Sequence, residues 1–340
     1  MALEGLGMSF FKPFGRKKVK RVLSREEKLR YYGLEFIKLT ALALFLSPAN
    51  SLFTNFMLFH PTKDTVADAQ QVKELKKKFN LTWTDEYFKS KDGTKIHGWY
   101  ITQPGARKTF LVSHGNGGDL VYRLPIVEAL ASSGESMFLY DYQGYGKSDG
   151  KPTPEGIVQD GVGAYDYLVN EKMVAAKDII LYGESLGCSV STAIGQARPV
   201  NGIVLQSGFS TITDAARDKL PWFHLYPDIA FPQRFLDNVT AYKTQHPPLL
   251  LLHGKDDWIL PCTYSQKIFD SAVEPKELVL VPNCSHNDVF GQSKEISTKA
   301  INVFVQKLIS QTVANKKVPD TILKTAANTN QSLQTQPRNN

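Results

Sequence analysis

The chain has 340 residues, of which 42% are hydrophobic and 21% charged, with 24 glycines, 18 prolines and 3 cysteines. This composition is too apolar for a disordered chain, too poor in cysteine for a disulfide scaffold and too poor in glycine and proline for a fibrous protein. The net charge of +7 lies at the two ends, because residues 1–38 carry +6 and the residues after Gln311 carry +3. The remainder is nearly neutral, so we expect no phosphate-binding groove and no nucleic-acid partner.

An uncharged apolar segment, residues 39–59, follows the basic N-terminal segment 1–38. About 20 apolar residues are needed to cross a bilayer, and this segment reaches that length only if its polar break at residues 47–51 is tolerated. Three interpretations stay open: an uncleaved signal-anchor, a cleaved signal peptide, and an amphipathic segment that lies on a membrane or packs on the domain. We expect a membrane-associated protein with one N-terminal anchor. The positive-inside rule then predicts residues 1–38 in the cytoplasm and the rest of the chain on the non-cytoplasmic side.

A charged, helix-favouring connector (60–80) leads into a globular domain predicted over residues 81–312. Two alternating runs, Trp83–Lys89 and Lys95–Thr102, are joined by Lys91-Asp92-Gly93 and predict a β-hairpin. Continuous apolar runs then alternate with amphipathic helical stretches. Strands are expected at 109–113, 136–140, 178–182, 203–206, 249–253 and 278–281, and helices at 120–132, 154–170, 185–196, 264–271 and 294–310. This alternation predicts an α/β fold with a mostly parallel sheet covered by helices on both faces. Residues 313–340 are polar and are predicted to be a disordered tail.

The sequence Gly183-Glu184-Ser185-Leu186-Gly187 joins a predicted strand to a predicted helix. This G-x-S-x-G pattern in strand–turn–helix context is typical of a nucleophilic serine on a sharp turn, at a helix N-terminus that favours developing negative charge. The alternative is a tight turn with a bystander serine. We predict Ser185 as a nucleophile.

A serine hydroxyl needs a positioned base, and that base needs a carboxylate to orient it. Two carboxylates, Asp256 and Asp257, follow the strand that ends at His253-Gly254, and His286 follows the next strand. His286 is the one histidine placed between the last predicted strand and the last predicted helix. We therefore predict it as the base. His114 and His253 each precede a glycine at a strand end and are expected to brace loops.

A glycine-rich loop, His114-Gly115-Asn116-Gly117-Gly118, follows an early strand and leaves backbone N–H groups unpaired. Such groups stabilise a tetrahedral oxyanion, and we expect the N–H groups of Asn116 and Leu186 to do so. The loop matches neither phosphate-binding pattern, G-x-x-x-x-G-K-S/T or G-x-G-x-x-G. Tyr142, after the next strand, is expected on the pocket wall.

Cys188, Cys262 and Cys284 form no CxxC pair, and no histidine lies at metal-ligand spacing from them. We therefore expect unpaired thiols, no metal site and no cofactor, with a Cys262–Cys284 bridge left open.

Taken together in chain order, these motifs resemble a serine α/β-hydrolase of the group that includes N-terminally anchored depalmitoylases, monoglyceride-lipase-like enzymes and serine-aminopeptidase-like enzymes. The resemblance covers about residues 80–312. It favours Asp257 over Asp256 as the triad acid, because Asp257 has the H-G-x-x-D spacing. It also implies a short cap over about residues 208–248, with Phe209 and Trp222 in an open, apolar substrate pocket.

The resemblance implies a hydrolase of carboxylic esters or thioesters whose substrate is a small or lipid acyl compound or an acylated protein. The chain departs from the depalmitoylases because it has no cysteine before Cys188 for lipid attachment. A serine peptidase is the alternative, and it would need a cap carboxylate among Asp214, Asp218, Asp228 and Asp237 to hold a substrate amino group. A non-catalytic binding module is the third hypothesis. It is disfavoured because all three triad residues and the glycine-rich loop are present.

Overall fold

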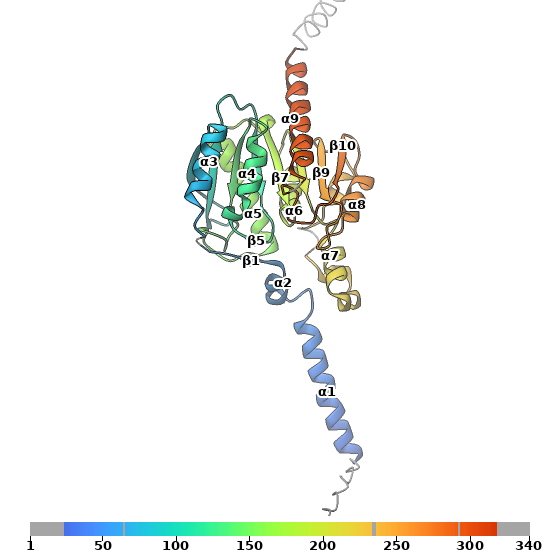
Figure 1. Ribbon diagram of the computed structural model, residues 1–340. Helices are drawn as coiled ribbons and strands as arrows, with labels where there is room; N and C mark the ends of the chain where they lie inside the picture. Colours follow the sequence, from blue (N-terminus) through green and yellow to red (C-terminus); the bar gives the residue numbers. More distant parts are fainter. Residues whose placement is uncertain (1–23, 64, 233–235, 292, 318–340) are drawn as a thin grey trace, which may run out of the picture. The chain divides into compact units, whose positions relative to one another are not determined.

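The computed structural model describes residues 24–63, 65–232, 236–291 and 293–317 (Figure 1). These residues divide into two units, with the boundary between Leu46 and Ser47. The first unit contains helix α1 (Arg25–Phe45), and the second contains the sheet and every other described element. The predicted tail lies largely outside the described residues, although helix α9 continues to Lys317, past the predicted start of the tail.

The apolar segment 39–59 is not one helix. Helix α1 is charged over its first half, so only its last turns are apolar, and it ends at Phe45. The polar break then caps a second helix, α2 (Ser51–Leu58), because the Asn50 side chain accepts a hydrogen bond from the Leu52 N–H at 3.1 Å. No helix in the described ranges combines the length and apolarity that a membrane crossing needs. This finding overturns the predicted anchor and the membrane localisation that depended on it.

The second unit is built on an eight-stranded sheet with the strand order β10-β9-β8-β7-β4-β6-β3-β2. The predicted hairpin is confirmed, since β2 and β3 pair antiparallel with Lys89 opposite Lys95. β3 also pairs antiparallel with β6, and every other neighbouring pair in this sheet is parallel. The strands are β2 (Thr82–Lys89), β3 (Lys95–Thr102), β4 (Thr109–Ser113), β6 (Ser136–Tyr140), β7 (Ile179–Glu184), β8 (Gly202–Gln206), β9 (Leu249–Gly254) and β10 (Lys276–Val281).

Helices cover both faces of this sheet, as predicted (Figure 1). Successive strand side chains alternate between two cores: Leu111 and Leu181 belong to one, and Phe110 and Ile180 to the other. The first core contains side chains of α5 (Pro154–Asn170), α6 (Gly187–Ala197) and α8 (Thr263–Ser271). The second contains side chains of α3 (Ala69–Phe79), α4 (Leu124–Ala131) and α9 (Lys294–Lys317), so the predicted connector helix α3 is part of the packed unit.

The predicted cap is short and has little regular structure. Its described elements are helix α7 (Ile212–Lys219) and three single 3-10 turns, η3 (Pro221–Leu225), η4 (Asp228–Ala230) and η6 (Thr240–Tyr242). Two further 3-10 turns, η1 (Leu120–Arg123) and η2 (Ala176–Asp178), precede α4 and β7. Parallel strands place their following loops at one sheet edge, so the loops after β4, β7, β9 and β10 gather there beside the cap.

One pairing was not predicted from the sequence. Strand β1 (His60–Pro61) pairs in parallel with β5 (Gly117–Gly118), which lies in the glycine-rich loop after β4. The two residues of β1 follow α2 with only Phe59 between them, and Phe59 is buried in the core. The segment that was predicted to be an anchor is therefore tied to the loop that was predicted to bind the oxyanion.

Candidate active site

The turn between β7 and α6 holds Ser185 in a strained backbone conformation, with φ of +52°. Its N–H donates to the carbonyl of Gln206 on the neighbouring strand at 2.8 Å. The flanking glycines are required by space: a Cβ on Gly187 would lie 2.0 Å from the Ser113 carbonyl oxygen, and one on Gly183 would lie 2.5 Å from the Gly187 carbonyl oxygen. This is the geometry expected for a serine lifted out of the sheet edge.

The structure brings Ser185, His286 and Asp257 together, although they are separated along the chain. Nε2 of His286 lies 3.1 Å from Oγ of Ser185, and Nδ1 of His286 lies 2.6 Å from Oδ2 of Asp257. Asp257 follows β9 and His286 follows β10, adjacent parallel strands. These contacts assign the proton of the neutral imidazole to Nδ1, so Nε2 is free to accept the serine proton.

The carboxylate of Asp257 is saturated with donors. Its Oδ1 accepts the N–H groups of Ile259 at 2.9 Å and Leu260 at 2.8 Å, and its Oδ2 lies 3.2 Å from Nε2 of His253. Burial by itself would raise the pKa of Asp257, but the hydrogen bonds from His253 and His286 outweigh burial and hold this pKa below its usual range. The neighbouring Asp256 is exposed and lies outside this network.

The other two histidines at strand ends have structural partners. His253 is fully buried, with Nδ1 at 2.7 Å from the Ser265 hydroxyl and Nε2 at 2.8 Å from the Leu260 carbonyl oxygen. His114 is also fully buried, and its Nδ1 donates to the Gly115 carbonyl. Burial and the nearby Arg123 charge outweigh that hydrogen bond and lower the pKa of His114 to about 3, so this ring is neutral.

The glycine-rich loop lies against Ser185, since a Cβ on Gly115 would be 3.5 Å from Cβ of Ser185. Within the described residues, the N–H groups of Asn116 and Leu186 donate no hydrogen bond. The Asn116 carbonyl is held from two sides, by the His60 N–H at 3.0 Å and the Tyr145 hydroxyl at 2.7 Å. These contacts hold the loop at the Asn116 carbonyl and leave the N–H groups of Asn116 and Leu186 available.

An ion pair that sequence analysis missed lies under the same loop. Oε2 of Glu184 accepts the Gly115 N–H at 3.0 Å and lies 2.8 Å from Nε of Arg123. Arg123 in turn donates from Nη2 to the Gly117 carbonyl. Glu184 directly precedes Ser185, so this pair links the serine turn to the loop. Its members are 61 residues apart, and although Glu184 occupies the variable position before Ser185 in G-x-S-x-G, nothing in that pattern indicates an arginine partner.

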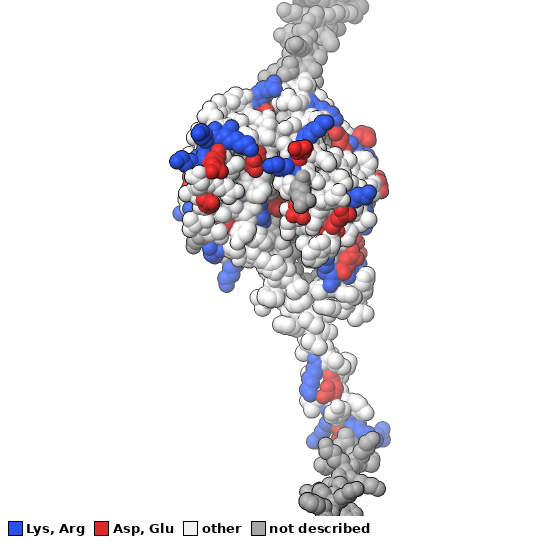
Figure 2. Space-filling view, viewed as in Figure 1, with Lys and Arg blue, Asp and Glu red and all other residues white. Residues whose placement is uncertain are grey.

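Ser185 and His286 lie in the wall of a cleft of about 850 Å³. Phe209, which was expected from the sequence to lie in a substrate pocket, lines the cleft. Tyr142 does not: it is fully buried and donates its hydroxyl to the His114 carbonyl, beneath the loop. Trp222 also lies outside the lining, and the adjacent Phe223 takes its place. The lining further includes side chains of α2, and the surface over α2 carries few charges (Figure 2).

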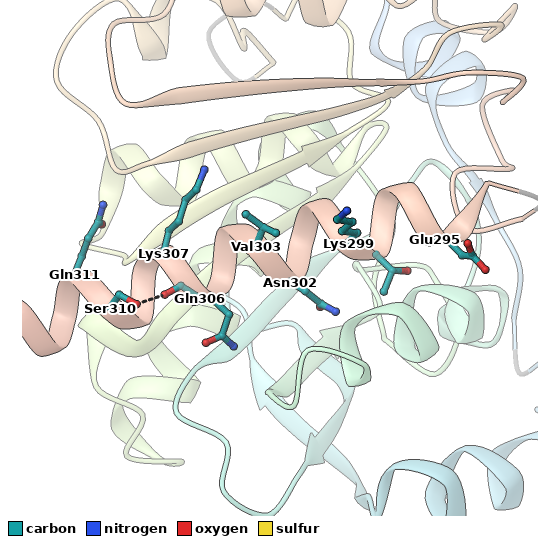
Figure 3. Close-up of a pocket in the computed structure, with 9 residues that line it drawn as sticks. Glu295, Lys299, Asn302, Val303, Gln306, Lys307, Ser310 and Gln311 are labelled. Atoms are coloured by element: carbon teal, nitrogen blue, oxygen red, sulfur yellow. Dashed lines mark hydrogen bonds between the residues drawn. The ribbon is translucent and has the colours of Figure 1, made fainter.

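A second concavity, of about 870 Å³, follows one face of α9 (Figure 3). The residues that line it all belong to this single helix, and most are of polar types, with Glu295, Asn302 and Lys307 among them. The hydroxyl of Ser310 there donates to the Gln306 carbonyl of its own helix, and no histidine lines the groove. It therefore offers no counterpart to the Ser185 and His286 arrangement.

The three cysteines are free thiols. Burial raises the pKa of Cys284 to about 11, so this thiol stays protonated at neutral pH. Among the described residues, no group of three or more histidine, cysteine, aspartate or glutamate side chains is arranged to hold a metal ion.

Comparison with known proteins places these observations in context. The family model described as serine aminopeptidase, S33, matches residues 104–232. The protein YfhR of Escherichia coli O157:H7 is 32% identical over 212 residues, which are 60% of this chain and 73% of YfhR. The α/β-hydrolase domain-containing protein WAV2 of Arabidopsis thaliana is 25% identical over 298 residues, covering 82% of this chain and 94% of WAV2.

Among solved structures, the esterase Pf2001 of Pyrococcus furiosus superposes with a TM-score of 0.60 at 19% identity. The match covers 74% of this chain and 98% of the esterase. At this identity the likeness shows the fold: a mostly parallel α/β-hydrolase sheet flanked by helices.

Proposed function

This chain belongs to the serine α/β-hydrolase superfamily, and on that premise we propose that it hydrolyses carboxylic esters or thioesters of acyl groups through an acyl-enzyme on Ser185. The observation that carries this proposal is the 3.1 Å contact between Oγ of Ser185 and Nε2 of His286 in the wall of a mainly apolar cleft. The fold likeness to an esterase supports it.

In the proposed reaction, Oγ of Ser185 attacks the acyl carbonyl carbon as its proton passes to Nε2 of His286. Asp257 holds the resulting imidazolium through the Nδ1 hydrogen bond, and the N–H groups of Asn116 and Leu186 stabilise the oxyanion. The intermediate then expels the alkoxide or thiolate, which takes the proton from His286. Water attacks the acyl-enzyme with His286 again as base, which releases the carboxylic acid and restores the serine.

An aminopeptidase is the second candidate, because the matching family model carries that description. An aminopeptidase needs a carboxylate that faces the cleft and binds the substrate amino group. None of the four cap carboxylates considered above lines the cleft. Each of the four has a partner elsewhere. Two form ion pairs, Asp214 with Lys267 and Asp228 with Arg217. The other two accept hydrogen bonds, Asp218 from the Tyr264 hydroxyl and Asp237 from the N–H groups of Val239 and Thr240. These partners favour the ester or thioester reaction.

The proposal is tested with the full-length protein and Ser185→Ala, each incubated with a fluorophosphonate probe, p-nitrophenyl esters and aminoacyl p-nitroanilides. We expect labelling and ester turnover in the parent only, with little anilide cleavage. Preferred cleavage of the anilides would replace the esterase proposal with the peptidase. A folded parent that is not labelled and turns over neither substrate would favour a binding module.

A further inference from the structure

Helix α2 faces the catalytic cleft with one side only. Phe53, Thr54, Met57 and Leu58, spaced as one face of a helix, line the cleft. On the opposite side of α2, Leu52 is 80% exposed and Phe56 is 74% exposed. A helix of eight residues without a charged side chain therefore presents a selected set of side chains to the cavity that contains Ser185.

The cap supplies the opposing wall of the same cavity. Phe223 of η3 lies edge-to-face with Phe53, with ring centroids 6.2 Å apart, and it also meets Phe231 at 5.5 Å. The α7 side chains Ile212, Ala215 and Ala216 continue this wall. The part of the cleft between α2 and the cap is therefore apolar.

Charged groups in the lining are few and have partners. They are Arg123, Glu184 and Lys219. The first two pair with each other under the glycine-rich loop, and Nζ of Lys219 lies 3.4 Å from the Trp258 carbonyl oxygen. A lining of this kind suits a hydrocarbon chain and offers no carboxylate to an ammonium group.

The position of α2 is fixed relative to the catalytic loop. The Thr54 hydroxyl donates to the Pro48 carbonyl at 2.8 Å, which braces the first turn of α2. After α2 ends, Phe59 enters the core and His60 pairs with the glycine-rich loop. The distance between the α2 wall and Ser185 is therefore set by packing and by backbone pairing.

We propose that α2 is the wall of an acyl-chain channel and that it determines which chain length the enzyme prefers, with medium- and long-chain acyl esters or thioesters as the substrate class. This inference rests on the proposed function of Ser185. Each methylene that enters an apolar channel is stabilised by about 0.8 kcal/mol, which corresponds to about a fourfold gain in kcat/KM until the channel is full.

The test compares kcat/KM for soluble p-nitrophenyl esters with acyl chains of two to twelve carbons, using the full-length protein. Two variants, Phe53→Trp and Met57→Trp, fill the cleft side of α2, and Phe56→Trp is the matched control on its outer side. Labelling of Ser185 by a small fluorophosphonate and circular dichroism are measured for every variant. These two readouts report the nucleophile and the fold independently of chain length.

We expect the kcat/KM of the parent to rise with acyl chain length. In at least one cleft-side variant, kcat/KM for the longest esters should fall about tenfold or more, while kcat/KM for the acetate changes little. Phe56→Trp should follow the parent. If the parent is labelled but hydrolyses acetate as well as long esters, or if folded cleft-side variants keep its chain-length profile, α2 is not the determinant. If the folded parent is neither labelled nor active, the proposed function itself fails, and the inference fails with it.

Discussion

Nδ1 of His286 lies 2.6 Å from Oδ2 of Asp257, and this is one of four hydrogen-bond contacts that the carboxylate makes. The other three join it to a buried histidine and to two backbone N–H groups of its own loop. A carboxylate held in this way cannot rotate to a different partner without losing several hydrogen bonds. The contact therefore fixes both the tautomer and the orientation of His286.

Replacing Asp257 with Asn should leave the protein folded and lower kcat by about 10⁴-fold, because an amide disrupts the Nδ1 tautomer on which the base depends. The matched control is Asp256→Asn, which changes the adjacent, exposed carboxylate and should keep near-parental activity. The kcat of both variants, measured by steady-state ester hydrolysis, shows which of the two carboxylates orients His286. A larger loss for Asp256→Asn would move the acid role to Asp256.

Glu184→Gln should lower kcat by about tenfold to hundredfold with little change in KM. The amide keeps an acceptor for the Gly115 N–H but loses the charge that holds Arg123 against the loop. Loosening an oxyanion loop costs less than removing a donor, which costs about 10²–10³-fold. Kinetics on a short ester give the kcat and KM split, with Glu171→Gln, an exposed site, as the control. An effect confined to KM would contradict a positioning role.

His60→Pro should reduce kcat by about fivefold to tenfold, because proline removes the N–H that donates to the Asn116 carbonyl. Phe59 has extended backbone, with φ −117° and ψ 127°, and so accepts a following proline without strain. His60→Ala keeps the N–H and should behave as the parent. Equal kinetics for the two variants would show that the β1 pairing does not hold the loop.

Asp160 makes stability depend on pH. Burial raises the pKa of Asp160 to about 7, only partly offset by the hydrogen bond that its Oδ2 accepts from the Gln143 N–H. A carboxyl whose folded pKa is raised stabilises the fold below its unfolded pKa, about 3.8, and this contribution is lost as pH rises through about 7. Asp160→Asn should therefore become more stable relative to the parent as pH rises through this window.

Urea unfolding of the parent and Asp160→Asn at about pH 5 and pH 8 measures this difference. Asp149→Asn, at an exposed carboxyl, serves as the control for a general charge effect. The same pH dependence in the parent and Asp160→Asn would contradict the assignment.

The sheet was predictable because its strands leave a strong local signal. Buried parallel strands such as β4 and β9 are continuous apolar runs, and the Asp92-Gly93 turn marks the hairpin. Asp257 and His286 were candidates from the sequence because each follows such a strand, β9 and β10 respectively. Their mutual distances depend on strand order, which no local pattern contains.

The features that were wrongly predicted or missed in the sequence also have physical explanations. Apolar residues that line a cleft and apolar residues that face lipid look alike in a sequence, so residues 39–59 predicted an anchor. Trp222 and Phe223 are adjacent in a 3-10 turn, and aromatic content alone does not tell which of them faces the cleft. Strand β1 has only two residues, too few to show a period. The Arg123–Glu184 pair forms only through tertiary packing, so no local sequence pattern indicates it.

The central claim is that Ser185 carries the acyl group during turnover. The most direct measurement is rapid-quench mixing of the full-length protein with a medium-chain p-nitrophenyl ester, followed by digestion and mass spectrometry of the peptide that contains Ser185. We predict a mass increase equal to the acyl group, located on Ser185, that forms with the first burst of nitrophenol. Ester hydrolysis without that adduct, retained in Ser185→Ala, would contradict the account.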